Sequence, residues 1–142
     1  GYGFMANVEH MVSRNKSGKS FVTVAEEESL CPPSLAQSAQ QASTHVACAS
    51  SGGRILTFEL TDLKLQEKGG RGLMLIDLEA KDRLVGAVAY NRSIRIEGTG
   101  RGGKAREETL EIRSLNNARA PRGRKGKVAD LGFKPERLIR VE

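Results

Sequence analysis

The sequence predicts an all-β, propeller-like fold of about three four-stranded blades that form an open or incomplete disk. Short runs of β-type residues separated by turn residues recur along the chain, and helical periodicity is nearly absent. Basic, glycine-containing segments also recur, at a spacing of about 50 residues. A repeat near this length with about four strands has the size of one propeller blade.

Seven segments read as strands, and several of them alternate apolar and polar residues, which predicts one buried and one solvated face. They are residues 21–24, 45–48, 54–60, 73–76, 84–90, 93–96 and 137–141. The Ser/Ala/Gln-rich residues 34–44 are compatible with either a loop or a short helix.

The repeat is anchored at two places that share one constant offset. Tyr2-Gly3-Phe4 matches Arg54-Ile55-Leu56, and the basic segment 14–20 matches 66–72. A looser third copy of the basic segment lies at 121–127, one repeat beyond the second. We therefore expect units of about 1–50, 51–90 and 91–142. Each unit should bury its apolar face against its neighbour and leave an exposed edge at the end units.

Length and composition indicate one domain with a basic surface. The chain has 142 residues, with 23 Lys and Arg against 17 Asp and Glu and a net charge of +6. Hydrophobic residues make up 38% and Trp is absent, so the core has to be built mainly from Val, Ile, Leu and Ala. A single domain over residues 1–142 is expected rather than two.

Several classes of protein are excluded by the sequence. No apolar run approaches the roughly 18 residues of a membrane-spanning helix, and no signal peptide is evident. The cysteines Cys31 and Cys48, with only His10 and His45 in support, predict neither a metal site nor a disulfide framework. This cysteine usage favours a reducing compartment such as a bacterial cytoplasm. The start on Gly1 without an initiator Met predicts a fragment of a longer chain.

The excess positive charge lies near the end of the chain. Residues 1–50, 51–90 and 91–142 carry net charges of −1, 0 and +7. The basic segments combine cations with glycines that let a backbone approach a surface closely, which is what phosphate binding without base readout requires. One such loop alone reads more readily as a solvated turn. Three in register favour a basic track that a bent duplex follows, with the third loop contributing most to affinity.

The candidate DNA-binding residues are the cations of these three segments together with two cations of the glycine-rich segment 98–104. They are Arg14, Lys16, Lys19, Lys68, Arg71, Arg101, Lys104, Arg122, Arg124, Lys125 and Lys127.

Other patterns do not carry chemistry. Ser17-Gly18-Lys19-Ser20 lacks the earlier glycine and the strand-to-helix setting of a nucleotide-binding P-loop. The GxGxxG pattern at 98–103 lacks its βαβ setting and reads as a flexible cationic loop. Glu26-Glu27-Glu28 reads as a solvated turn, because successive carboxylates point in different directions. No catalytic constellation is found, so no catalytic residue is predicted.

Taken together, these segments resemble a known family. The residues that carry the resemblance are Gly1 to Phe4, Arg14 to Lys19, Pro32-Pro33, Gly53 to Phe58, Asp62-Leu63, Lys68 to Gly72, Arg122 to Gly126 and Arg137 to Glu142. Nearly the whole chain resembles the C-terminal domain of the A subunit of bacterial topoisomerase IV, which is a type IIA topoisomerase. The related C-terminal domain of the DNA gyrase A subunit is the next most similar.

The resemblance implies a β-pinwheel whose blades exchange strands and whose basic rim binds and bends double-stranded DNA. It also implies partners, namely the remainder of the A subunit and the topoisomerase IV B subunit, in an A2B2 heterotetramer on the bacterial chromosome in the cytoplasm. That enzyme decatenates and relaxes DNA with ATP and Mg, neither of which the resemblance places in this non-catalytic domain. The tyrosine nucleophile of the family is not carried over to Tyr2 or Tyr90.

Alternatives remain open at this point. Gyrase carries one well-formed, glutamine-led basic segment that drives DNA wrapping, and the three segments here depart from it, which favours topoisomerase IV and bending. The runner-up readings are the wrapping domain of the gyrase A subunit and a β-propeller protein-interaction module whose basic rim meets acidic partners. The third alternative is that this chain is an enzyme in its own right.

Overall fold

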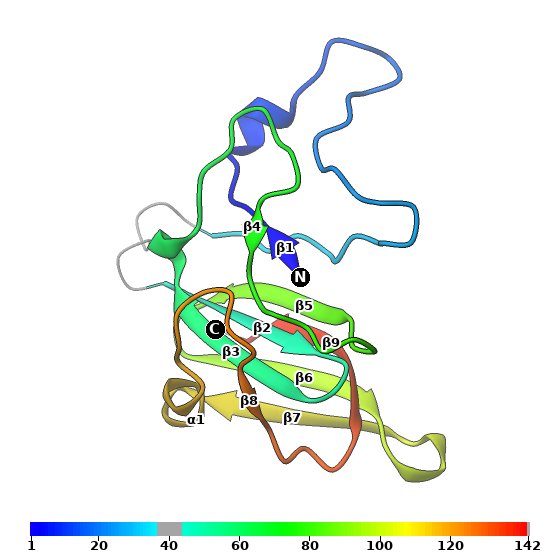
Figure 1. Ribbon diagram of the computed structural model, residues 1–142, viewed down its shortest axis with the longest axis vertical. Coiled ribbons are helices and arrows are strands. Elements are labelled where there is room, and N and C mark those ends of the chain that lie inside the picture. Colours follow the sequence, from blue (N-terminus) through cyan, green and yellow to red (C-terminus); the bar gives the residue numbers. More distant parts are fainter. Residues whose placement is uncertain (37–43, 142) are drawn as a thin grey trace.

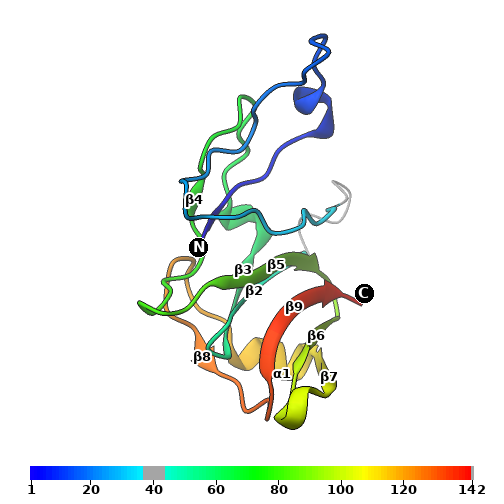
Figure 2. The ribbon, with the colours of Figure 1, turned by 90° about the vertical axis from the view of Figure 1, so that its right-hand side faces the viewer.

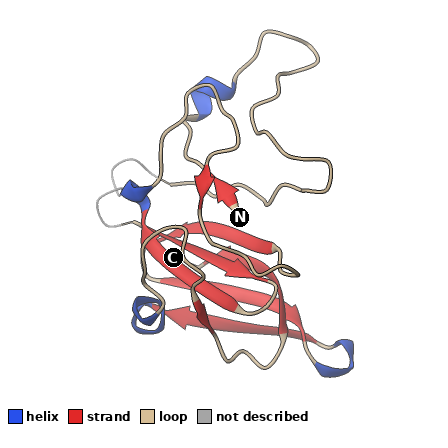
Figure 3. Cartoon of the chain, viewed as in Figure 1, coloured by secondary structure: helices blue, strands red, loops and turns tan. Residues whose placement is uncertain are grey.

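The computed structural model describes residues 1–36 and 44–141, and these form a stack of antiparallel sheets with a few short helices (Figures 1 and 3). The strands are β1 Tyr2–Gly3, β2 His45–Ser50, β3 Arg54–Glu59, β4 Leu73–Met74, β5 Leu84–Tyr90, β6 Ser93–Thr99, β7 Ala105–Glu111, β8 Lys127–Val128 and β9 Lys134–Arg140. The helices are the 3-10 turns η1 Val8–Met11, η3 Leu60–Asp62 and η4 Arg101–Gly103, and the α-helix α1 Ile112–Asn117.

Three separate sheets make up the described chain. Their strand orders are β1-β4, β5-β2-β3-β8 and β7-β6-β9, and every pairing is antiparallel. Figure 2 shows them stacked with the four-stranded sheet in the middle. The all-β, open propeller-like prediction is confirmed, although only the middle sheet has four strands among the described residues. That sheet combines strands that are distant in the chain, since β8 joins it from the third basic segment.

The strands β2, β3 and β5 of the middle sheet are buried on both faces, which corrects the expectation of one solvated face for these strands. On β2, Ala47 and Ala49 pack into the core shared with the three-stranded sheet, whereas Val46 and Cys48 pack toward the core beside β4. The two faces are buried because this sheet lies between two others, so its strands need apolar residues on both sides. The large buried side chains include Phe58 and Tyr90, and the rest of both cores is mainly aliphatic.

The sequence repeat appears as repeated backbone pairing. Tyr2 of β1 pairs with Met74 of β4, and one repeat further along the chain Arg54 of β3 pairs with Val128 of β8. The flanking contacts recur with the same shift. The hydrogen bond from Leu75 N to Gly1 O recurs as Ala129 N to Gly53 O, and that from Gln66 N to Met5 O recurs as Ala120 N to Thr57 O. The parallel bridge Met5–Leu65 recurs as Thr57–Arg119. Two units of the chain therefore share one local architecture.

Five of the seven predicted strands match observed strands, and two differ. Residues 21–24 form only an isolated bridge, Val22 with Gly70, and the strand predicted at 73–76 is confined to β4. Residues 105–111 form β7, which has too few apolar residues to be recognised in sequence and is an edge strand paired with β6. Of the ambiguous segment 34–44, residues 37–43 lie outside the described residues, and 34–36 have no regular structure. Among the described helices, none is long and apolar enough to cross a membrane.

Candidate nucleic-acid interface

The second basic segment, residues 66–72, forms a loop that is seated on the first unit; we call it the second loop. Gly70 N donates to Phe21 O at 2.8 Å, and Thr23 N donates to Gly70 O at 2.8 Å. Gln66 closes the loop from inside, because its Nε2 donates to Gly69 O at 2.7 Å. Gly69 and Gly72 have φ values of 75° and 91°, and a Cβ on either would run into the backbone of Phe21 or Gly3. Only glycine fits these two positions.

The third basic segment, residues 121–127 and hereafter the third loop, is held in the same way one unit further on. We call the backbone positions that hold a loop its seat: 21 and 23 for the second loop, 75 and 77 for the third. Gly123 N donates to Leu75 O at 2.8 Å, and Asp77 N donates to Arg124 O at 3.0 Å. Positions 75 and 77 stand one repeat after positions 21 and 23, which seat the second loop. Arg54 adds a further tie, since its Nη1 donates to Gly126 O at 3.1 Å. The basic loop of each unit is thus fixed to the segment that follows the basic loop of the unit before it.

The first basic segment, residues 14–20 and hereafter the first loop, is differently supported. Gly18 N donates to Asn15 O at 2.9 Å and closes a local turn. A Cβ at Gly18 would meet nothing within 4 Å, in contrast to Gly69 and Gly72. Lys19 Nζ lies 5.7 Å from the centre of the Phe21 ring. The first loop therefore adjoins the seat of the second loop through Phe21 without being packed into a seat of its own.

The cations of these loops are presented to solvent with one exception. Arg14, Lys16, Lys19, Lys68, Arg71, Arg124, Lys125 and Lys127 are exposed. Arg122 is only partly exposed, and its Nη1 donates to Met74 O at 2.6 Å. Its guanidinium therefore helps to hold the third loop on β4.

Known proteins are similar to this chain in sequence. Residues 44–91 match the family described as DNA gyrase C-terminal domain, beta-propeller. The chain is 35% identical over 134 residues to the A subunit of DNA topoisomerase 4 from Neisseria gonorrhoeae, and the match covers 92% of this chain and 17% of that protein. It is 31% identical over 139 residues to the same protein of Haemophilus influenzae, with 94% and 18% covered.

This chain belongs to the family of C-terminal domains of the topoisomerase IV and gyrase A subunits.

Solved structures of the family share the fold. The E. coli ParC C-terminal domain superposes with a TM-score of 0.71 at 23% identity, over 97% of this chain and 56% of that one. A crystal structure of the C-terminal domain of DNA topoisomerase IV gives a TM-score of 0.73 at 17% identity, with 97% and 43% covered. The chain spans 17% and 18% of the length of the two topoisomerase relatives above.

The two remaining candidate cations lie apart from the first and second loops. Arg101 and Lys104 are exposed at η4, beyond the end of β6. Figures 1 and 2 both show η4 at the end of the molecule opposite to the first and second loops. Gly102 and Gly103 have φ values of 75° and 78°, and a Cβ on either would meet nothing within 4 Å. The structure therefore brings nine of the eleven candidate residues to adjoining loops and leaves these two apart.

Several side chains around the loops escaped the sequence analysis. The guanidinium Cζ of Arg71 lies 4.3 Å from the centre of the Tyr2 ring, within the range of a cation–π contact. Arg71 also approaches Glu28, and Lys125 approaches Glu79. Arg54 was recognised only as part of a strand, and Gln66 only as part of a basic segment. Tyr2 and Arg54 are the first residues of the two matching anchors of the repeat, which is the one signal that could have singled them out.

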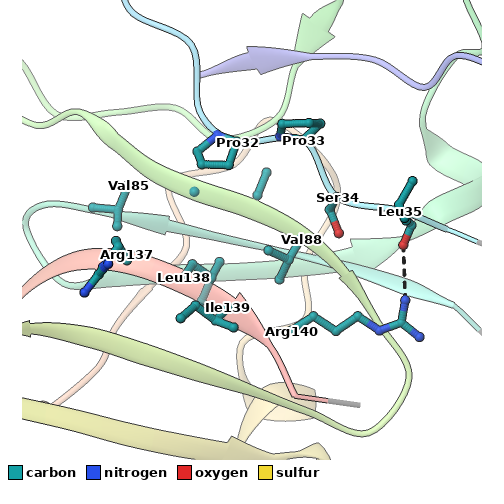
Figure 4. A pocket seen from close by; sticks show the side chains of 12 residues that line it. Pro32, Pro33, Ser34, Leu35, Val85, Val88, Arg137, Leu138, Ile139 and Arg140 are labelled. Carbon is teal, nitrogen blue, oxygen red and sulfur yellow. Dashed lines mark hydrogen bonds between the residues drawn. The ribbon is translucent and has the colours of Figure 1, made fainter. Parts of the chain in front are cut away.

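A mainly apolar cavity of about 440 Å³ lies elsewhere. It is formed by β5, β9 and residues 32–35, as Figure 4 shows, and its lining includes Val85, Val88 and Leu138. Arg140 Nη1 donates to Leu35 O at 3.1 Å at its edge. The second arginine that lines it, Arg137, has its Nη2 3.2 Å from Glu97 Oε1. The described residues also contain no cluster of three or more His, Cys, Asp or Glu arranged to hold a metal ion.

Proposed function

We propose that this chain binds duplex DNA on the rim formed by the three loops and bends it without reading its sequence. The observation that carries the proposal is the repeated seat of the second and third loops. Each seat fixes a glycine-containing backbone through main-chain hydrogen bonds and presents exposed cations, of which Arg71 and Lys125 stand at equivalent positions. Fixed cations on an exposed backbone bind phosphates regardless of base identity. Arg101 and Lys104, at the far end, belong to the proposed surface as a separate contact.

The family suggests the process in which this binding takes part. We propose that the domain positions duplex DNA for ATP-dependent strand passage by topoisomerase IV, in decatenation and relaxation of supercoils. In this proposal the remainder of the A subunit, together with the B subunit, completes an A2B2 enzyme on the chromosome in the bacterial cytoplasm. ATP and Mg then act in parts of that enzyme outside this chain.

Bending is favoured over full wrapping by the structure of the loops. The second loop comes nearest to the glutamine-led segment of gyrase, and its cations are Lys68 and Arg71. The third loop has more cations, but one of them, Arg122, is directed at the carbonyl of Met74. A rim with unequal loops supports local contacts more readily than a continuous wrap.

Binding of a labelled duplex by the intact protein, measured by fluorescence anisotropy between 50 and 300 mM salt, tests the proposal. For roughly five to eight phosphate contacts, the slope of log K against log salt is expected to be about −5 to −7. Duplexes of different sequence should give similar affinities, and a duplex labelled at both ends should show increased energy transfer on bending. A slope near zero, or binding to an acidic protein but not to DNA, overturns the proposal in favour of a protein-interaction module.

A further inference from the structure

Each seated loop faces an acidic turn of the preceding unit. Residues 25–28 form a turn closed by Glu28 N donating to Ala25 O at 3.0 Å. Residues 79–82 form the same turn, closed by Asp82 N donating to Glu79 O at 2.9 Å. The two turns are related by the same shift along the chain as the seats of the loops, so they belong to the repeated architecture.

Both turns direct a carboxylate at the equivalent cation of the loop. Glu28 Oε2 lies 3.6 Å from Arg71 Nη2, and Glu79 Oε1 lies 3.5 Å from Lys125 Nζ. Arg71 and Lys125 occupy equivalent positions of successive units. Glu28 comes from the last position of its turn and Glu79 from the first, so two different sequence solutions place a negative charge at the same point of the rim.

The carboxylate of Glu28 is held in position for this contact. Its Oε1 accepts a hydrogen bond of 3.0 Å from Ala25 N, which leaves Oε2 facing Arg71. On the other partner, the guanidinium is held over the Tyr2 ring. Both ends of the ion pair are thus restrained by contacts other than the pair itself, which lowers the entropy lost in forming it.

We propose that the two acidic turns are built-in counterions that DNA phosphates must displace, so that Glu28 and Glu79 limit the affinity and the salt dependence of DNA binding. This inference rests on the proposed function. A carboxylate and a phosphate compete for the same guanidinium or ammonium group. While Glu28 neutralises Arg71, DNA binding breaks an internal pair there and gains less from counterion release.

The Arg71–Glu28 pair gives the sharper test. Glu79 Oε1 also lies 3.8 Å from Arg54 Nη2, and Arg54 holds Gly126 of the third loop, so a change of Glu79 would alter the seat as well. Glu28→Gln removes the charge but keeps an oxygen that can accept from Ala25 N. Glu26→Gln is the matched control, because it removes the same charge from the same exposed turn.

The experiment is a set of salt titrations of DNA binding. They compare the intact protein, its Glu28→Gln and Glu26→Gln variants, and each of these two changes separately in an Arg71→Gln background. Exposed ion pairs have modest strength, so Glu28→Gln is expected to tighten binding about 1.5- to 5-fold near 0.1 M salt. The slope should steepen by up to about 0.9. Glu26→Gln should leave the slope unchanged, and Glu28→Gln should give no gain in the Arg71→Gln background.

The outcomes separate the two proposals. If the unmodified protein binds duplex DNA but Glu28→Gln and Glu26→Gln behave alike, or if the gain persists without Arg71, the counterion role is overturned and DNA binding stands. If the unmodified protein shows no salt-dependent DNA binding, the proposed function fails and this inference fails with it. Equal melting temperatures of the Glu28 and Glu26 variants confirm that the turn remains folded.

Discussion

The cations of the third loop offer the most direct test of the proposed rim. The triple variant Arg124→Gln, Lys125→Gln and Lys127→Gln removes three exposed charges. Arg122 is left in place because it donates to Met74 O and supports the loop. If each cation contacts one phosphate, the log–log salt slope should become shallower by up to about 2.7, since one contact contributes about 0.9 and the pairing of Lys125 with Glu79 lowers its share. Extrapolated from 1 M salt, that change corresponds to about a 10²-fold loss of affinity at 0.15 M.

Fluorescence anisotropy of a labelled duplex between 50 and 300 mM salt measures both quantities. The matched control removes three exposed cations outside the loops, Arg92, Arg113 and Lys134. This control should change the salt slope by less than about 0.9, the contribution of one phosphate contact, because these charges act on DNA only through the screened field. Equal losses in the two triple variants would refute the reasoning that the loop positions, rather than the net charge, determine binding.

A triple variant of the first loop separates loop position from loop support. Arg14→Gln, Lys16→Gln and Lys19→Gln remove the same number of charges as the third-loop variant. We expect a smaller loss of affinity, since the first loop is not packed into a seat and a less restrained loop loses more entropy on binding. A loss equal to that of the third-loop variant would contradict a role for the seat.

Three further predictions concern the scaffold. In thermal unfolding, Gly69→Ala should lower the melting temperature more than Gly102→Ala. Both glycines have a φ of 75°, which disfavours Ala by about 1–2 kcal/mol, but only at Gly69 does the new Cβ meet backbone. Thr57→Val should destabilise the fold by about 1–3 kcal/mol in urea unfolding, because the buried hydroxyl donates to Leu115 O at 3.0 Å and its loss leaves that carbonyl without this donor. Burial raises the pKa of Cys48 from 9.0 to about 12, so above pH 9 the unfolded state releases a proton that the folded state keeps. The free energy of unfolding should therefore fall by about 1.4 kcal/mol per pH unit up to about pH 12. In Cys48→Ala this fall should be shallower.

The strands that the sequence predicted correctly are those whose own residues carry the apolar pattern. β5 and β6 are examples, because their buried residues face a core that any sheet arrangement would need. β7 has only Leu110 packed against that core, and its strand state comes from pairing with β6 along its whole length. Residues 21–24 show the opposite case, since their β-type pattern forms a single bridge, between Val22 and Gly70 of the second loop. Pairing partners, rather than local preference, decide both segments.

The basic loops were predictable because glycine and charge are both local properties. Which cations are available to DNA is not local. The ion pairs of Arg71 with Glu28 and of Lys125 with Glu79 join residues that are distant in the sequence, and they exist because one unit packs on the next. The inward direction of Arg122 likewise depends on a distant residue, Met74 of β4. Charge counted along the sequence therefore overstates the positive potential that the second and third loops present.

If the proposed function holds, the seats account for binding by a rim of short loops without base readout. The third loop is fixed to residues 75 and 77, and these follow directly on the second loop through β4. The separation of the two sets of cations is therefore determined by strand geometry and not by flexible linkers. Rigid spacing reduces the ordering entropy lost on binding and suits the regular spacing of phosphates on a duplex. In the proposed complex, the backbone and cations of both loops contact phosphates, so an additional unit would extend the contact without adding base readout.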